Sequence, residues 1–100
     1  MLPRNRRPTL PGEILRHEFL EPLGLSQKEL AAALGITRVR LSEILRGKRA
    51  ITPDTAFRLA RFFDTTPEFW LGLQTDVSLW DTLQAHAGEY EKIKPVGTTA

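Results

Sequence analysis

The stretch Arg38–Arg46 carries side chains of the types that read the edges of base pairs. In a helix of about 100° per residue, its apolar residues Leu41, Ile44 and Leu45 share one side, while Val39 and the polar residues turn the other way. In the major groove, arginine pairs with guanine, glutamate accepts from the amino group of cytosine, and valine contacts the methyl group of thymine. The spacing therefore predicts a base-reading surface made of Arg38, Val39, Ser42 and Glu43.

A second set of polar residues lies around that surface and suits the phosphate backbone. Gln27 opens the preceding helix, where a backbone N–H and a side-chain amide can hold a phosphate. Lys48 and Arg49 directly follow the stretch, and residues 38–49 carry five cations against one acid. We expect these contacts to give affinity and register rather than sequence preference. The expected backbone set is Gln27, Thr37, Arg40, Arg46, Lys48 and Arg49, and the alternative is an ordinary solvated charge run.

Two short helices must position these residues. The first begins with a capping box, in which Ser26 and Glu29 satisfy each other's free backbone N–H groups. It ends at Gly35, which can take a positive φ, and Thr37 is the expected N-cap of the second helix. The small residue Ala31 allows the two helices to approach closely. The pattern predicts a helix-turn-helix over about residues 26–46, whose second helix enters the major groove.

Another helix is expected before this motif. It runs from about Gly12 to Leu20, with apolar residues at helical spacing. Pro22 is predicted to break it, and Gly24 to provide a left-handed exit.

Two further helices follow the motif. A threonine, a proline and an acid stand together at Thr52 and again at Thr66, which is a typical helix start. Gly88 is expected to end or interrupt the last helix. Because no segment alternates like a strand, the predicted fold class is all-α, with five helices. We expect an N-terminal arm over 1–10, a helix-turn-helix domain over 11–87 and a tail over 88–100.

The last helix carries apolar residues beyond those that one core needs. Trp70 and Leu73 are expected in the core, together with the phenylalanines Phe57, Phe62, Phe63 and Phe69. The core should be complete by about residue 77. A single helix-turn-helix domain buries too little surface to discriminate an operator well, so a dimer is expected. The predicted dimer interface is the outer stripe Val77, Trp80 and Leu83.

Composition argues against an enzyme. The chain has 100 residues, enough for one domain, and no cysteine, so a disulfide, a thiolate zinc site and a cysteine nucleophile are excluded. With only His17 and His86, a metal site is not expected, and the glycines do not gather into a phosphate-binding loop. We therefore expect no catalytic residue, no cofactor and no metal. No apolar run approaches the length of a membrane span, and no secretory signal is recognisable, so no membrane partner is expected.

The charge is unevenly distributed along the chain. The net charge is +2, from 14 cations and 12 acids. Residues 1–50 hold ten cations and five acids, for +5, whereas residues 51–100 hold four cations and seven acids, for −3. Such an asymmetry favours a polyanionic partner on one side of the molecule.

The segment LSQKELAAALGITRVRLSEILRGKRAIT resembles the lambda-repressor-like helix-turn-helix proteins of the XRE class. The flanking segments RPTLPGEILRHEFLEPLGLS and TPDTAFRLARFFDTTPEFWLGLQ make the chain similar to HigA-type, or VapI-like, antitoxins over about residues 7–83. The resemblance implies a cytoplasmic homodimer that binds double-stranded operator DNA, represses its own operon and neutralises a RelE-like (HigB-type) mRNA endoribonuclease toxin. Carried over by position, Arg38, Val39 and Glu43 match base-contacting sites, and Gln27, Arg46 and Lys48 match backbone-contacting ones. Residues 77–79 depart from the family's usual Tyr-Asp-Leu element.

Two alternatives remain open from the sequence. The first is a solitary XRE-family transcriptional regulator without a toxin partner, which gene context would distinguish. The second is a protein-interaction module that has lost DNA contact, and the basic segment 38–49 argues against it.

Overall fold

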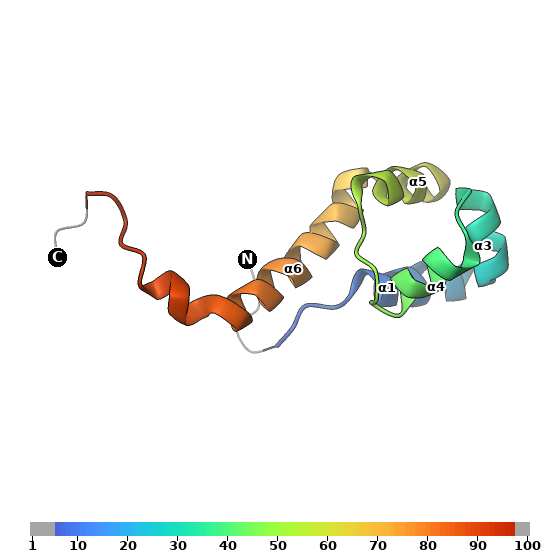
Figure 1. The fold of residues 1–100 in the computed structure, drawn as a ribbon. Helices are drawn as coiled ribbons and strands as arrows, with labels where there is room; N and C mark the ends of the chain where they lie inside the picture. The colour runs from blue at the N-terminus through green and yellow to red at the C-terminus, as the bar shows by residue number, and fades with distance from the viewer. Residues whose placement is uncertain (1–5, 98–100) are drawn as a thin grey trace.

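A computed structural model describes residues 6–97, and every regular element in that range is helical (Figure 1). The elements are α1 (Pro11–Ile14), the π-helix η1 (Leu15–Leu20), α2 (Glu21–Leu23), α3 (Gln27–Leu34), α4 (Arg38–Leu45), α5 (Pro53–Phe63) and α6 (Pro67–Glu91). Because α1, η1 and α2 follow one another without a break, the chain forms the five helical segments that the sequence predicts. Residues 1–5 of the predicted arm and 98–100 of the predicted tail lie outside the described range.

The first helical segment is longer than predicted, because Pro22 does not break it. The segment continues to Leu23 and ends at Gly24, whose φ of +65° confirms the left-handed exit. Proline has no N–H to bond to a carbonyl four residues back, and its ring crowds that carbonyl. Just before it the helix widens into π turns, and the N–H of Glu21 donates to the carbonyl of Arg16, five residues back. The wider turn lets the helix pass the proline.

The helix-turn-helix forms as the sequence predicts. The Ser26 hydroxyl accepts from the Glu29 N–H at 3.0 Å, and the Glu29 carboxylate accepts from the Ser26 N–H at 2.9 Å. That backbone hydrogen bond lowers the pKa of the Glu29 carboxyl. Gly35 has a φ of +70°, and the Thr37 hydroxyl caps α4 by accepting from the Arg40 N–H at 3.0 Å. These local contacts fix the angle at which α4 leaves α3.

A single apolar core joins the helices, and it includes Trp70, which lies in the first turn of α6. Trp70 is fully buried, its ring centroid lies 5.1 Å from that of Phe19, and its indole N–H donates to the Thr65 hydroxyl at 2.8 Å. The buried apolar residues of the core are Leu15, Leu20, Leu30, Ala31, Leu34, Leu41, Ile44, Leu45, Ile51, Ala56, Leu59, Ala60 and Trp70.

Three of the four phenylalanines predicted to lie in the core are exposed. Phe57 is 64% exposed, Phe62 42% and Phe69 41%, whereas Phe63 packs partly buried against the core. On α5 the buried positions are Thr55, Ala56, Leu59 and Ala60. Helical geometry turns positions 57 and 62 about a quarter turn or more away from that stripe. For α5 the prediction was wrong because Leu59 and three small residues, not the phenylalanines, occupy the face of this helix that packs on the core.

The last helix differs from its prediction in length and in the side it buries. α6 passes through Gly88 and ends at Glu91, and Figure 1 shows it running away from the other helices. The described chain is therefore elongated, with extents of 58 × 22 × 22 Å. Within the described residues, no helix is both long and apolar enough to cross a membrane.

Val77 does not belong to an outer stripe, contrary to prediction. It is 3% exposed and lines a small cavity of about 150 Å³ with Leu10 and Pro11. Nearby, the Arg7 guanidinium donates to both oxygens of Asp81, at 2.9 and 2.7 Å, which ties the N-terminal arm to α6. The side of α6 that carries Val77 and Asp81 thus faces its own chain.

Candidate nucleic-acid interface

The exposed face of α4 and the start of α3 share a hollow that runs from Arg38 to Arg46. The hollow has a volume of about 370 Å³ and is lined by Gln27, Arg38, Val39, Ser42 and Arg46. Val39 is 68% exposed and lies among polar neighbours, so most of its apolar side chain faces solvent. The structure therefore brings together three residues predicted to read bases and two predicted to contact the backbone.

Glu43 lies outside this hollow and is held by Arg49. Its Oε1 accepts from Nε of Arg49 at 3.0 Å and from Nη2 at 2.7 Å. Its backbone carbonyl also accepts from the N–H groups of Lys48 and Arg49, which closes the turn after α4. Glu43 was predicted to read bases and Arg49 to contact phosphate, and in this structure the two side chains form an ion pair with each other. The pair uses only Oε1 of Glu43 and the Nε and Nη2 groups of Arg49, so Oε2 of the carboxylate and Nη1 of the guanidinium can still face DNA.

Arg40 is directed toward α5 and not toward the hollow. Its Nη2 donates to Asp54 Oδ2 at 3.0 Å and to the buried Thr55 hydroxyl at 2.6 Å. The prediction of a phosphate contact rested on its position beside the exposed face of α4, and the sequence does not show that α5 provides acceptors there. The structure gives Arg40 the role of a link between α4 and α5.

Asp54 joins this link to the turn between α3 and α4. The same Oδ2 accepts from Nε of Arg58 at 2.9 Å, which confirms the predicted i,i+4 pair. Nη1 of Arg58 in turn donates to the Leu34 carbonyl at 2.9 Å, at the end of α3. Hydrogen bonds from Arg58 and then Arg40 lower the pKa of the Asp54 carboxyl. One carboxylate thus fixes both helices of the motif to α5.

The remaining predicted backbone residues, Thr37 and Lys48, are exposed but do not line the hollow, and Lys48 lines the small cavity beside Val77. Thr37 is exposed although its hydroxyl caps α4, and Lys48 follows Gly47, whose φ is +73°. Nε of Arg46 lies 3.4 Å from the Ser42 carbonyl, so this side chain stays along α4.

Two positioning residues were missed by sequence reasoning. Gly12 lies so close to the end of α4 that an added Cβ would stand 2.7 Å from the Leu45 carbonyl oxygen, and closer still to that of Ile44. Gln74 of α6 accepts from the Ile51 N–H at 2.9 Å, which holds the segment after α4. A glycine at a helix start and a glutamine inside a helix carry no signal of such long-range contacts.

Comparison with known proteins agrees with this geometry. The family profile for helix-turn-helix domains matches residues 17–70. Antitoxin HigA-1 of Vibrio cholerae is 43% identical over 91 residues, which cover 91% of this chain and 86% of that protein. The chain belongs to the HigA family of helix-turn-helix antitoxins. The resemblance that the sequence indicates is thereby confirmed, as is the all-α helix-turn-helix fold. This is a family of DNA-binding regulators and antitoxins, not of enzymes.

Two further relatives are informative within the family. An uncharacterized HTH-type transcriptional regulator of Haemophilus influenzae is 53% identical over 76 residues, covering 76% of this chain and 71% of that one. Among solved structures, the Pseudomonas aeruginosa antitoxin HigA with the higBA promoter is 41% identical. It has a TM-score of 0.85 and covers 90% of this chain and 99% of its own. That relative is therefore a HigA protein seen together with promoter DNA.

Proposed function

We propose that this protein binds the operator of its own toxin–antitoxin operon as a homodimer in the cytoplasm, represses that operon, and neutralises a RelE-like (HigB-type) endoribonuclease by binding it. The observation that carries the DNA-binding part is the hollow of α3 and α4, which presents Arg38, Val39 and Ser42 beside Gln27 and Arg46. These side chains offer donors, a hydroxyl and an apolar group to base edges, with an amide and a guanidinium for the adjacent strand. A HigA relative at 41% identity has been solved with its promoter.

The homodimer is supported by the outer side of α6. Opposite Val77 and Asp81, helical geometry places a stripe that consists of Gly72, Asp76, Leu79, Leu83, His86 and Tyr90. Leu79 is 51% exposed and Leu83 43%, while the predicted interface residue Trp80 lies half-buried beside the stripe. Of the three residues predicted for the interface, the stripe contains Leu83, Trp80 lies beside it, and Val77 is buried.

The stripe is self-complementary about a two-fold axis. A two-fold axis perpendicular to α6 makes the helices of two copies antiparallel, because a half turn about it reverses the direction of the helix, and the same patch of each copy then faces the other. If Leu79 of one copy packs on Leu83 of the second copy, the same register sets Asp76 opposite His86 and Gly72 opposite Tyr90. An acid then meets an imidazole, and the residue without a side chain meets the aromatic ring.

A DNA titration and a pull-down test the two binding parts of the proposal. Operator DNA from upstream of the gene is titrated with the protein, and the product of the adjacent gene is offered in a pull-down. The proposal expects protection of two half-sites one helical turn or a multiple apart, together with capture of the toxin. Protection of a single half-site by a monomer contradicts the dimer. For the dimer alone, Trp80→Glu should lower the mass in light scattering while the circular dichroism melt stays cooperative.

The second candidate is a solitary regulator without a toxin. It is favoured by relatives of 50–53% identity that are described only as HTH-type transcriptional regulators. Operator binding together with no toxin gene beside this one, and no captured partner, would support this candidate.

A further inference from the structure

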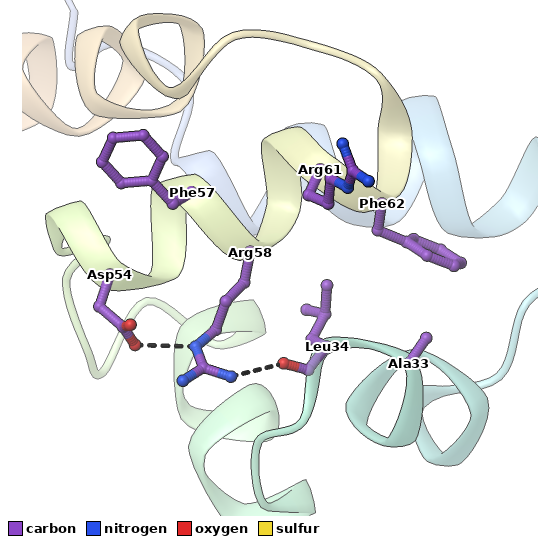
Figure 2. A pocket seen from close by; sticks show the side chains of 7 residues that line it. All are labelled: Ala33, Leu34, Asp54, Phe57, Arg58, Arg61 and Phe62. Carbon is purple, nitrogen blue, oxygen red and sulfur yellow. Dashed lines mark hydrogen bonds and ion pairs between the residues drawn. The ribbon is translucent and has the colours of Figure 1, made fainter.

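A second hollow, separate from the one on α3 and α4, lies between α5 and the end of α3 (Figure 2). It has a volume of about 550 Å³, and Ala33 of α3 contributes a small wall. Phe57 and Phe62 lie to either side of Arg58 along α5, and both rings are largely exposed, at 64% and 42%. We call this the α3–α5 surface and define it by Ala33, Phe57, Arg61 and Phe62.

The surface combines apolar rings with a free cation. Arg61 stands one helical turn from Phe57 and is exposed, and among residues 6–97 it makes no ion pair. Arg58 is already engaged by Asp54 and the Leu34 carbonyl. Phe57 and Arg61 also line a smaller hollow of about 250 Å³ that continues the surface toward Asp64. Aromatic residues and arginine are the types that dominate the energetics of protein interfaces.

Neither of the other two exposed surfaces uses these residues. The DNA-reading hollow is lined by a different set, and the antiparallel pairing of α6 uses the opposite end of the molecule. The Phe62 ring packs edge-on against Phe63, with 4.9 Å between their centroids, but both Phe57 and Phe62 still leave apolar area in water. An antitoxin needs a surface for a partner protein that is not taken by DNA or by its own second copy.

We propose that the α3–α5 surface is where the toxin docks, through a segment that packs apolar side chains on the exposed rings of Phe57 and Phe62 and sets a carboxylate on Arg61. This inference rests on the proposed toxin partner. Burying the two phenyl rings against the toxin removes apolar area from water, which favours binding. The Arg61 guanidinium favours a segment that carries a carboxylate beside its apolar side chains. Asp54 and Arg58 stay as they are, because they hold α4 through Arg40.

The test is a calorimetric titration of the full-length protein with the purified toxin from the adjacent gene. Phe57→Ala, Phe62→Ala and Arg61→Glu are each expected to weaken toxin binding about tenfold or more, in the range of interface hot spots. Leu23→Ala is the matched control, since Leu23 is 60% exposed on α2 and outside the surface. Operator affinity and the circular dichroism melt of all variants should equal those of the wild type, which separates docking from folding.

Three outcomes would overturn the inference. If the three variants bind toxin within twofold of the wild type, the toxin docks elsewhere while the proposed toxin partner stands. If Phe57→Ala changes the oligomeric state, the surface is an interface between copies of this chain. If the wild-type protein binds no toxin, the proposed neutralisation and this docking site both fail.

Discussion

Gly12→Ala tests whether a single close approach sets the position of α4. In the structure an added Cβ would lie 2.7 Å from the Leu45 carbonyl oxygen, where an ordinary contact begins at 3.4 Å. The Ile44 carbonyl is closer still, and both atoms belong to the backbone, so no side-chain rotation relieves the contact. The Leu45 oxygen alone requires α1 and the end of α4 to move apart by about 3.4 − 2.7 = 0.7 Å, and the nearer Ile44 oxygen requires more than that.

The expected cost follows from that displacement. Overpacking a well-packed site costs about 1–3 kcal/mol, and alanine recovers up to about 1 kcal/mol through its better helix propensity. A net loss of about 1–2 kcal/mol should lower the melting temperature by roughly 4–8 °C per kcal/mol in a domain of this size. The folded variant should also bind operator more weakly, because the end of α4 has shifted.

The assay is a circular dichroism melt at one fixed protein concentration, with Gly88→Ala as the matched control. Gly88 also lies in a helix, but nothing stands within 4 Å of its added Cβ, so alanine should keep or raise the melting temperature there. A Gly12→Ala protein that melts at or above the wild-type temperature would refute the close packing of α1 on α4.

Three other tests address the site, the hydrogen-bond network and the dimer. Arg38→Ala should weaken operator binding by about 1–3 kcal/mol and relax the preference at one base position. Lys48→Ala should weaken binding to operator and to random DNA alike, and titrations of both DNAs would show this. Asp54→Asn should lower the melting temperature at neutral pH. Because the pKa of Asp54 is lowered in the folded state, its stabilisation of the fold is present above the ordinary pKa of 3.8 and is lost as the pH falls through the folded pKa. The melting temperatures of the wild type and Asp54→Asn should therefore converge in acid. A difference in melting temperature that persists in acid contradicts this role of Asp54. Since the chain has no cysteine, a mixture of Leu79→Cys and Leu83→Cys proteins should form a disulfide-linked heterodimer on oxidation, faster than either protein alone; equal rates would contradict the register.

The sequence predicts most of the local structure of this protein correctly, because local structure depends on neighbours along the chain. Ser26, Thr37, Thr52 and Thr66 all cap helices as expected, each through a backbone N–H three residues ahead. The helix ends at Pro22 and Gly88 were wrong, because a π turn accommodates one and a glycine costs only about 1 kcal/mol within a helix at the other.

Contacts between distant elements were harder to predict. The exposure of Phe57 depends on how α5 is rotated against the core, and small residues on its inner face decide that rotation. The partners of Arg40 come from α5, fourteen and fifteen residues away. A helical wheel of α4 alone shows which way a side chain leaves its own helix, but not which acceptors another helix brings to it.

The cations of residues 38–49 form two groups once these contacts are known. Arg40 and Arg49 are held by Asp54 and Glu43, whereas Arg38, Arg46 and Lys48 are exposed and make no ion pair within residues 6–97. Each phosphate neutralised on duplex DNA contributes about 0.9 to the slope of log affinity against log salt. Three free cations in each copy of a dimer therefore limit this segment's contribution to about −5. A clearly steeper slope that returns to this value in Arg49→Gln would mean that the Arg49 guanidinium also neutralises a phosphate. A slope unchanged in Arg49→Gln would mean that Arg49 neutralises no phosphate and serves to hold the Glu43 carboxylate.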